Sequence, residues 1–88
     1  MDYQVIVTDG AEKDLRKLER QTVYQRLRRA IEGLAQEPRP QGCLKLTTQP
    51  GYWIRVGDYR VVYEIEDAIR VVSVTRVGHR GGFYDRLP

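Results

Sequence analysis

Residues 52–66 alternate in side-chain character on both sides of the pair Gly57-Asp58. Alternation with period two is typical of a β-strand with one buried face, and a Gly-Asp pair between two such runs is typical of a tight hairpin turn. The sequence therefore predicts two antiparallel strands, residues 52–56 and 59–66, joined by a two-residue loop. A loop of this length fixes which residues face each other, so the rest of the chain has to fold around this register.

The predicted register places like charges opposite each other, because Arg55 faces Arg60 across the hairpin. One face of the hairpin is the predicted core face and carries Tyr52, Ile54, Val56, Tyr59, Val61 and Tyr63. The other face carries Trp53, Arg55, Arg60, Val62 and Glu64. Facing like charges destabilise a sheet, so we expect the two arginines to serve a function such as holding an anion between them. The alternative is that both heads extend into solvent or pair with Glu64 or Asp58.

The flanking segments predict two helices and three further strands. Apolar spacings of three and four predict helices, and short β-branched or alternating runs predict strands: helices at residues 11–18 and 24–34, and strands at residues 3–8, 43–46 and 69–77. Asp9 and Glu12 have the spacing of a capping box at the start of the first helix. Pro38 and Pro40 end the second helix, because proline lacks an amide donor and restricts the residue before it.

The order of these elements predicts the fold class. Helices come early and strands late, which indicates an α+β fold rather than an α/β fold. We expect an N-terminal strand and a two-helix hairpin packed on one face of a mainly antiparallel sheet, with the other face partly open. Residues 78–82 leave the sheet in this prediction, and residues 83–87 form a short C-terminal tail. Residues 1–88 are enough for one domain.

Positive charge is concentrated in the second half of the chain. The sequence has 15 Lys and Arg against 12 Asp and Glu, a net charge of +3. Residues 1–38 carry seven basic and seven acidic side chains, and residues 39–88 carry eight and five, so the whole excess lies in the second half. After Lys17, Lys45 is the only lysine. The planar fork of arginine binds phosphate in a bidentate manner, so this usage indicates a partner that contains phosphate.

Several classes of protein are not expected from the composition. Cys43 is the only cysteine, so no internal disulfide can form, and we expect a small buried residue in a reducing cytosol. No Cys/His spacing or close pair of carboxylates in the basic half indicates a metal site, and no Ser/His/Asp set indicates nucleophilic catalysis. No stretch approaches the roughly 18 apolar residues of a membrane span, and no signal-peptide core follows Met1. We therefore expect a cytoplasmic protein without a cofactor.

A second polar cluster follows the predicted strand 69–77 and contains His79, Arg80 and Tyr84, interleaved with glycines. A histidine, with an ordinary pKa of about 6.5, suits proton transfer, and a tyrosine offers an aromatic face to a base. The alternatives are a surface histidine without a role and a tyrosine that packs on the sheet. RNA can be cleaved without metal, because its 2′-hydroxyl attacks the neighbouring phosphorus while arginines stabilise the charge on phosphate.

The run GYWIRVGDYRVVY at residues 51–63, with VGHR at residues 77–80 and Tyr84, resembles the RelE/ParE superfamily of type II toxins. The resemblance extends nearly from end to end and includes the Lys45-Leu46 pair. It implies a RelE-like fold and a cognate antitoxin that wraps the toxin with a helix or strand and masks the basic site. The toxin–antitoxin complex is expected to bind its own operator DNA through the antitoxin. For RelE-like members, the resemblance implies metal-independent cleavage of mRNA in the ribosomal A site by attack of the 2′-hydroxyl.

The resemblance implies catalytic roles for four residues. Arg60 matches the arginine that holds the scissile phosphate, and Arg55 matches a basic strand residue that stabilises the transition state. Arg80 matches the arginine proposed as proton donor to the leaving oxygen. Tyr84 matches the C-terminal tyrosine that stacks on the nucleotide and orients it.

Four further residues are expected as accessory or RNA-binding groups: Lys45, Trp53, Arg76 and His79. Trp53 is a departure, because RelE-like nucleases carry a basic residue at this position that is cast as the general base. Tryptophan cannot accept a proton. It can stack on a base instead, with Lys45 or His79 taking the place of the missing proton acceptor.

Two other functions stay open. A ParE-like toxin would inhibit DNA gyrase without cleaving RNA. Trp53 favours this alternative, whereas His79, Arg80 and Tyr84 oppose it. A degenerate toxin retained as an antitoxin-binding subunit is the other possibility.

Overall fold

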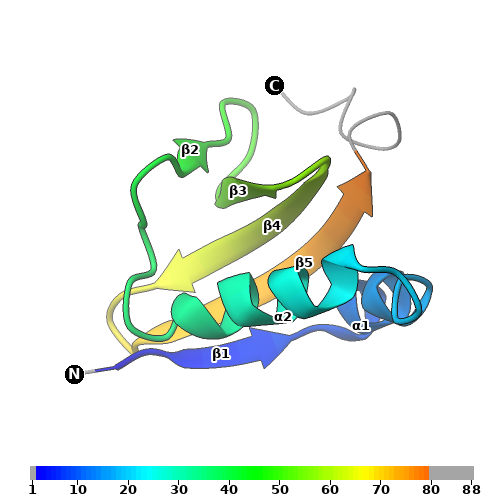
Figure 1. The fold of residues 1–88 in the computed structure, drawn as a ribbon. Coiled ribbons are helices and arrows are strands. Elements are labelled where there is room, and N and C mark those ends of the chain that lie inside the picture. Colours follow the sequence, from blue (N-terminus) through cyan, green and yellow to red (C-terminus); the bar gives the residue numbers. More distant parts are fainter. Residues whose placement is uncertain (1, 80–88) are drawn as a thin grey trace.

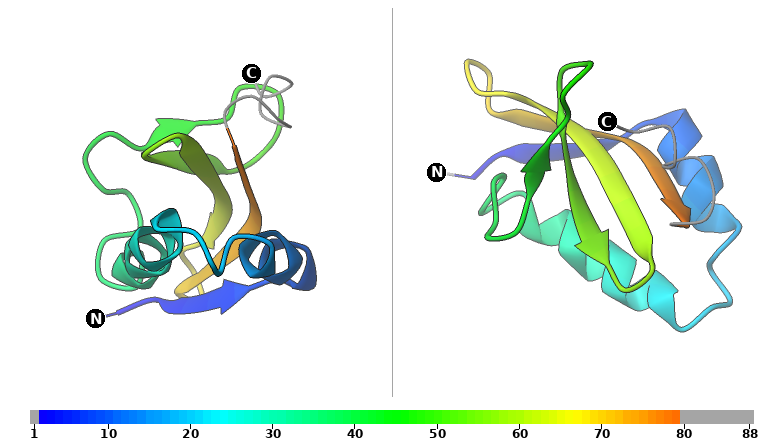
Figure 2. Two further views of the ribbon diagram at one scale, coloured as in Figure 1. Left: turned by 45° about the vertical axis from the view of Figure 1, so that its right-hand side comes forward. Right: turned by 90° about the horizontal axis from the view of Figure 1, so that it is seen from above.

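In residues 2–79, the part of the chain that the computed structural model describes, five strands form one sheet and two helices cover one of its faces (Figure 1). The elements in chain order are β1 (Gln4–Val7), α1 (Asp9–Arg16), α2 (Val23–Gly33), β2 (Leu44–Lys45), β3 (Tyr52–Val56), β4 (Tyr59–Glu66) and β5 (Val71–His79). The strand order is β1-β5-β4-β3-β2; β1 pairs with β5 in parallel, and the other neighbours pair antiparallel. Figure 2 shows both helices on the same side of a strongly twisted sheet. The predicted α+β architecture is confirmed.

The N-cap of helix α1 is Thr8, one residue before the predicted cap. Thr8 has an extended backbone, and its hydroxyl accepts a hydrogen bond from the amide of Ala11 at 3.3 Å. The capping box predicted for Asp9 and Glu12 is therefore wrong, because Asp9 is already the first residue of the helix and the amide of Glu12 donates to the carbonyl of Thr8 at 2.8 Å. Asp9 and Glu12 lie in the first turn instead, where negative charge complements the helix dipole.

Helix α2 buries the predicted apolar stripe against the sheet. Leu27, Ile31 and Leu34 are buried, and all three belong to the main hydrophobic core. Arg28 reaches from α2 to Glu12 of α1 in a 3.1 Å ion pair, which links the two helices. In the described part of the chain, no helix is long and apolar enough to cross a membrane.

The hairpin has the predicted register, with Val56 opposite Tyr59, Arg55 opposite Arg60 and Trp53 opposite Val62. Gly57 begins the loop with a φ of +60°, a conformation that glycine adopts without strain and that a type II′ turn requires at its first central position. The core face of the hairpin supplies buried side chains to the main core, namely Ile54, Val56, Val61 and Tyr63. The register of the hairpin therefore decides which of its side chains enter the core and which lie on the opposite face of the sheet.

Strand β5 starts and ends two residues later than predicted. Arg70 has a φ of +54°, so it belongs to the turn before β5. The prediction that Gly78 and His79 leave the sheet is wrong, because Gly78 pairs with Arg60 and His79 pairs with Tyr59. Strand β5 continues to His79 because the first residues of β4 provide backbone hydrogen-bond partners for its last residues.

A β-bulge interrupts the pairing of β4 with β5. The register shifts between Val62 and Tyr63 and leaves Thr75 as the extra residue of β5. The hydroxyl of Thr75 donates a hydrogen bond to the carbonyl of Val62 at 3.3 Å. Because the bulge resets the alternation of side chains, Val74 and Val77 both point into the core and are buried.

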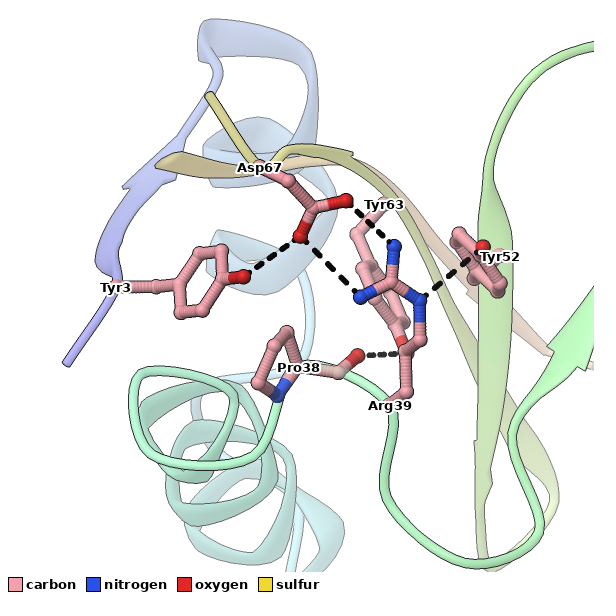
Figure 3. A network of polar contacts seen from close by, with 6 residues as sticks. All are labelled: Tyr3, Pro38, Arg39, Tyr52, Tyr63 and Asp67. Carbon is pink, nitrogen blue, oxygen red and sulfur yellow. Dashed lines mark hydrogen bonds and ion pairs between the residues drawn. The ribbon is translucent and has the colours of Figure 1, made fainter. Parts of the chain in front are cut away.

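A polar network, which we call the Asp67 network, joins four separate segments around the carboxylate of that residue (Figure 3). Arg39 donates from both terminal nitrogens to Asp67 at 3.3 and 2.9 Å, and from Nε to the hydroxyl of Tyr52 at 3.2 Å. The hydroxyl of Tyr3 donates to Asp67 at 2.6 Å. Hydrogen bonds from Arg39 and Tyr3 lower the pKa of Asp67 to about 2. The network ties the N-terminus and the α2–β2 connection to β3 and to the β4–β5 turn.

Tyr63 anchors the connection between α2 and β2 from inside the core. Its side chain is fully buried, and its hydroxyl donates to the carbonyl of Pro38 at 2.8 Å (Figure 3). Burial raises the pKa of Tyr63 well above that of an exposed tyrosine. Cys43 packs against the same core and is half-buried rather than buried as predicted, because it lies just before the short edge strand β2.

Candidate functional site

The sheet face opposite the helices carries arginines from three strands. Cross-strand partners share a face, and the pairing defines two neighbouring rows: Arg55, Arg60 and Gly78, and Trp53, Val62 and Arg76. We call the surface made by Trp53, Arg55, Arg60 and Arg76 the arginine face. Gly78 contributes no side chain to the row that contains Arg60.

Arg60 lies on the indole ring of Trp53. Its guanidinium carbon is 3.6 Å from the ring centroid. The contact follows from the register, because Trp53 faces Val62 and Arg60 lies two residues before Val62 on the same face. Trp53 is only 8% exposed and forms a small cluster with Val62 and Leu46, which are 6% and 4% exposed. A cation–π contact in such partly desolvated surroundings contributes about 1–2 kcal/mol.

Arg55 takes a different direction from its cross-strand neighbour. Its Nε donates to the carbonyl of Gly57 at 3.0 Å, and the side chain is exposed. The two facing guanidinium groups therefore diverge, one toward the hairpin turn and one onto the indole. This divergence relieves the repulsion that the sequence predicted between Arg55 and Arg60.

The accessory residues divide between the two faces of the sheet. Arg76 lies on the arginine face, opposite Val62 and exposed to solvent. Lys45 faces Tyr52 across β2 and β3, and His79 faces Tyr59, so both lie on the side of the helices. The rings of His79 and Tyr59 meet edge to face with centroids 5.1 Å apart. Neither Lys45 nor His79 shares the face of Arg60.

Arg80 and Tyr84 lie outside the described residues, so their predicted roles stay predictions. Within residues 2–79, no group of three or more histidine, cysteine, aspartate or glutamate side chains is placed to hold a metal ion. The described side chains of the arginine face supply fixed positive charge and guanidinium N–H donors. Such groups bind phosphate oxygens in bidentate geometry.

Asp14 supports the site and was missed from the sequence. Its carboxylate in α1 accepts a hydrogen bond from the amide of Val77 at 2.9 Å. Strand β1 pairs with β5 only as far as Val74, so Asp14 satisfies a backbone donor on the edge that β1 leaves uncovered. The contact holds the end of β5 that carries Gly78. The helical pattern around Asp14 gives no signal for this contact, which depends on where α1 packs.

An open groove of about 410 Å³ lies between α2 and β3, on the side of the helices. Its lining is mainly apolar and includes Ala30, Leu34, Ile54 and Val56. Arg55 also lines this groove, although its strand position belongs to the opposite face. The groove and the arginine face therefore meet at Arg55.

Comparison with known proteins identifies the family. The family model described as the ParE toxin of the type II toxin–antitoxin system parDE matches residues 5–82. Toxin RelG of Mycobacterium tuberculosis is 33% identical over 87 residues, covering 98% of this chain and 100% of that protein. The chain belongs to the RelE/ParE superfamily of toxins from type II toxin–antitoxin systems, as its sequence resemblance indicated.

Solved structures agree with this family. The crystal structure of the toxin–antitoxin complex RelBE2 from Mycobacterium tuberculosis has a chain that is 30% identical, with a TM-score of 0.79 and coverage of 91% of this chain and 100% of that one. The intact RelBE toxin–antitoxin complex of E. coli has a chain that is 32% identical, with a TM-score of 0.74 and coverage of 88% and 95%. The fold of this chain is therefore similar to that of RelE toxins.

Proposed function

We propose that this toxin is a ribosome-dependent mRNA interferase that cleaves mRNA by metal-independent attack of a 2′-hydroxyl on the scissile phosphate. The observation that carries the proposal is the arginine face, where Arg55, Arg60 and Arg76 project from three adjacent strands. Membership of a toxin superfamily that includes RelE-type proteins supports it.

The proposed reaction depends on stabilisation of the negative charge that develops on the phosphate. When the 2′-hydroxyl attacks phosphorus, negative charge builds on the non-bridging oxygens, and donors aimed at those oxygens lower the barrier. In our proposal Arg60 holds the phosphate and Arg55 stabilises the added charge. As the bond from the 2′-oxygen to phosphorus forms, the 2′-proton passes to water and the bond from phosphorus to the 5′-oxygen breaks, which leaves a 2′,3′-cyclic phosphate. Arg80 protonates the leaving 5′-oxygen, and Tyr84 stacks on the nucleotide.

A cleavage assay on translated message tests the proposal. Purified toxin is added to translating ribosomes, and the cleavage sites are mapped by primer extension. Arg60→Ala should lower the cleavage rate about 10²–10³-fold, the usual effect of removing one transition-state donor. Arg29→Ala, which removes an exposed arginine of α2, is the matched control and should cleave like wild type. Equal cleavage by wild type and Arg60→Ala would exclude the proposed role of the arginine face.

A second candidate function is inhibition of DNA gyrase without RNA cleavage. Two observations favour it: the family model that matches is the ParE model, and Arg60 covers the Trp53 ring at the position where RelE-like nucleases carry a basic residue. A supercoiling assay run beside the cleavage assay separates the two functions. Inhibited supercoiling with intact mRNA would establish the gyrase function.

We also propose that a cognate antitoxin binds in the groove between α2 and β3, close to Arg55. The structures of RelBE2 and of the E. coli RelBE complex are structures of similar toxins with their antitoxins. Ala30→Arg places a long charged side chain in this apolar groove and should prevent co-purification with the antitoxin. Gln25→Arg adds the same residue on the exposed side of α2 and should not. If both variants co-purify equally, the antitoxin binds elsewhere.

A further inference from the structure

Arg60 and Trp53 are in closer contact than the arginine–tyrosine pairs formed by Arg28, Arg39 and Arg70. The guanidinium carbon of Arg60 is 3.6 Å from the ring centroid. The corresponding contacts of Arg28, Arg39 and Arg70 with tyrosine rings measure 5.3, 5.2 and 5.4 Å. A separation of 3.6 Å is van der Waals contact over the ring itself, so the indole limits the positions that the guanidinium can take.

Burial decides what the indole can contact. Trp53 is 8% exposed, with Leu46 and Val62 in the same cluster, so little of its ring is left for a base to stack on. Arg60 is only half-buried as a residue, while its Nε is buried. The side chain is thus held near its middle, and other atoms of the residue remain open to solvent. This arrangement suits an arginine that is ordered before its ligand arrives.

We infer that Trp53 is a positioning residue that orders the Arg60 guanidinium for the phosphate of the substrate, and that it is not a surface for stacking bases. The inference rests on the proposed function, because it concerns the phosphate site of that reaction. A flexible arginine loses conformational entropy when it binds phosphate, and one that is already ordered on a ring loses less. The tryptophan that replaces a basic residue here therefore acts through its neighbour on the next strand.

A double-mutant cycle tests the inference in the cleavage assay. Trp53→Leu should lower the cleavage rate about tenfold, and Trp53→Phe, which keeps an aromatic face, should restore most of it. In an Arg60→Ala background, Trp53→Leu should have almost no further effect. Leu46→Ala removes packing from the same cluster and serves as the control for a general loss of stability. An undiminished effect of Trp53→Leu in the Arg60→Ala background would show that Trp53 contacts RNA directly and would overturn the inference.

A second measurement tests the contact without any activity. Trp53 is the only tryptophan of the chain, so intrinsic fluorescence reports on this ring alone. Arg60→Ala should change the emission, and Arg55→Ala should leave it unchanged. If Arg60→Ala leaves the emission unchanged, the contact is absent and the inference fails whatever the toxin does. If the emission changes but the wild type cleaves no mRNA, the proposed function fails and the positioning role in that reaction fails with it.

Discussion

Arg55 and Arg60 face each other directly, but their guanidinium groups contact different parts of the molecule. Arg55 binds the carbonyl of Gly57, and Arg60 lies on Trp53. The cost of placing two like charges side by side is thus reduced by contacts within the hairpin itself. Each arginine has a separate contact, so the two positive charges stay on the same face of the sheet without meeting.

Replacing Trp53 by the basic residue that RelE-like nucleases carry should destabilise this chain. Trp53→Lys loses a buried ring and brings a second cation beside Arg60, and we expect a loss of about 2–4 kcal/mol, reduced in part by the aliphatic stem of lysine. Urea denaturation measures this change. Leu44→Lys on the exposed edge strand, where the side chain is 50% exposed, is the control and should change stability little. Equal stability of the two variants would contradict the structural role of Trp53.

At the residue scale, sequence reasoning was strongest where two-residue periodicity applied. It placed Arg55 opposite Arg60 and Trp53 on the same face, both of which are confirmed. It did not find the Trp53–Arg60 contact, although the diagonal spacing of the two residues was available from the register. It also did not find Asp14, because a helix-to-strand contact depends on three-dimensional packing that no local pattern encodes.

Side chains join the elements of the sheet at its two ends, in addition to the pairing of the strands. The Asp67 network joins the segment before β1, the α2–β2 connection, β3 and the β4–β5 turn. At the other end, Asp14 of α1 holds the amide of Val77 in β5. The Asp14 contact supports β5 beyond the point where β1 stops, and the Asp67 network fixes the opposite end of the sheet.

The Asp67 network should make stability depend on pH in the acid range. The pKa of Asp67 is lowered to about 2 in the folded state from an ordinary 3.8, so the folded state favours the carboxylate. Its contribution is complete above about pH 4 and is lost as the pH falls through about 2. Urea denaturation between pH 5 and pH 2 should show a steeper loss of stability for wild type than for Asp67→Asn. Parallel curves would show that the network contributes nothing measurable.

Strand ends were the least predictable elements. The hairpin strands were predicted with their observed bounds, because the Gly57-Asp58 turn marks where both begin and end. The bounds of β5 shifted, because its last residues pair with the start of β4, and this pairing outweighs the local preference of Gly78 for a turn. The bulge at Thr75 was equally invisible in the sequence.

Charge is distributed unequally between the two halves of the chain. The helical half carries equal numbers of basic and acidic side chains, and the net charge of +3 arises from the second half, which contains the hairpin and β5. The arginine face and the helices lie on opposite sides of the sheet. This separation agrees with our proposals that the arginine face contacts a phosphate backbone and that the antitoxin binds beside the helices.

The salt dependence of RNA binding should increase with the number of arginines on the arginine face that contact phosphate. If Arg55, Arg60 and Arg76 each neutralise one phosphate, the logarithm of the binding constant for single-stranded RNA should fall against the logarithm of salt concentration with a slope of about −2. Arg76→Ala should make this slope less steep by about 0.7. Arg29→Ala should leave the slope unchanged, and equal slopes for wild type and Arg76→Ala would place the RNA elsewhere.

The position of β5 between β1 and β4 also sets the order in which this protein can be assembled. Gln4 pairs with Val71, so the first strand finds its partner only when the last described strand is present. Pairings between such distant residues form late, because a long loop must close first. The arginine face spans β3, β4 and β5. In a nascent chain that ends before β5, only the residues of this face on β3 and β4 are present. The toxin therefore acquires its complete arginine face only after nearly the whole sheet has been synthesised.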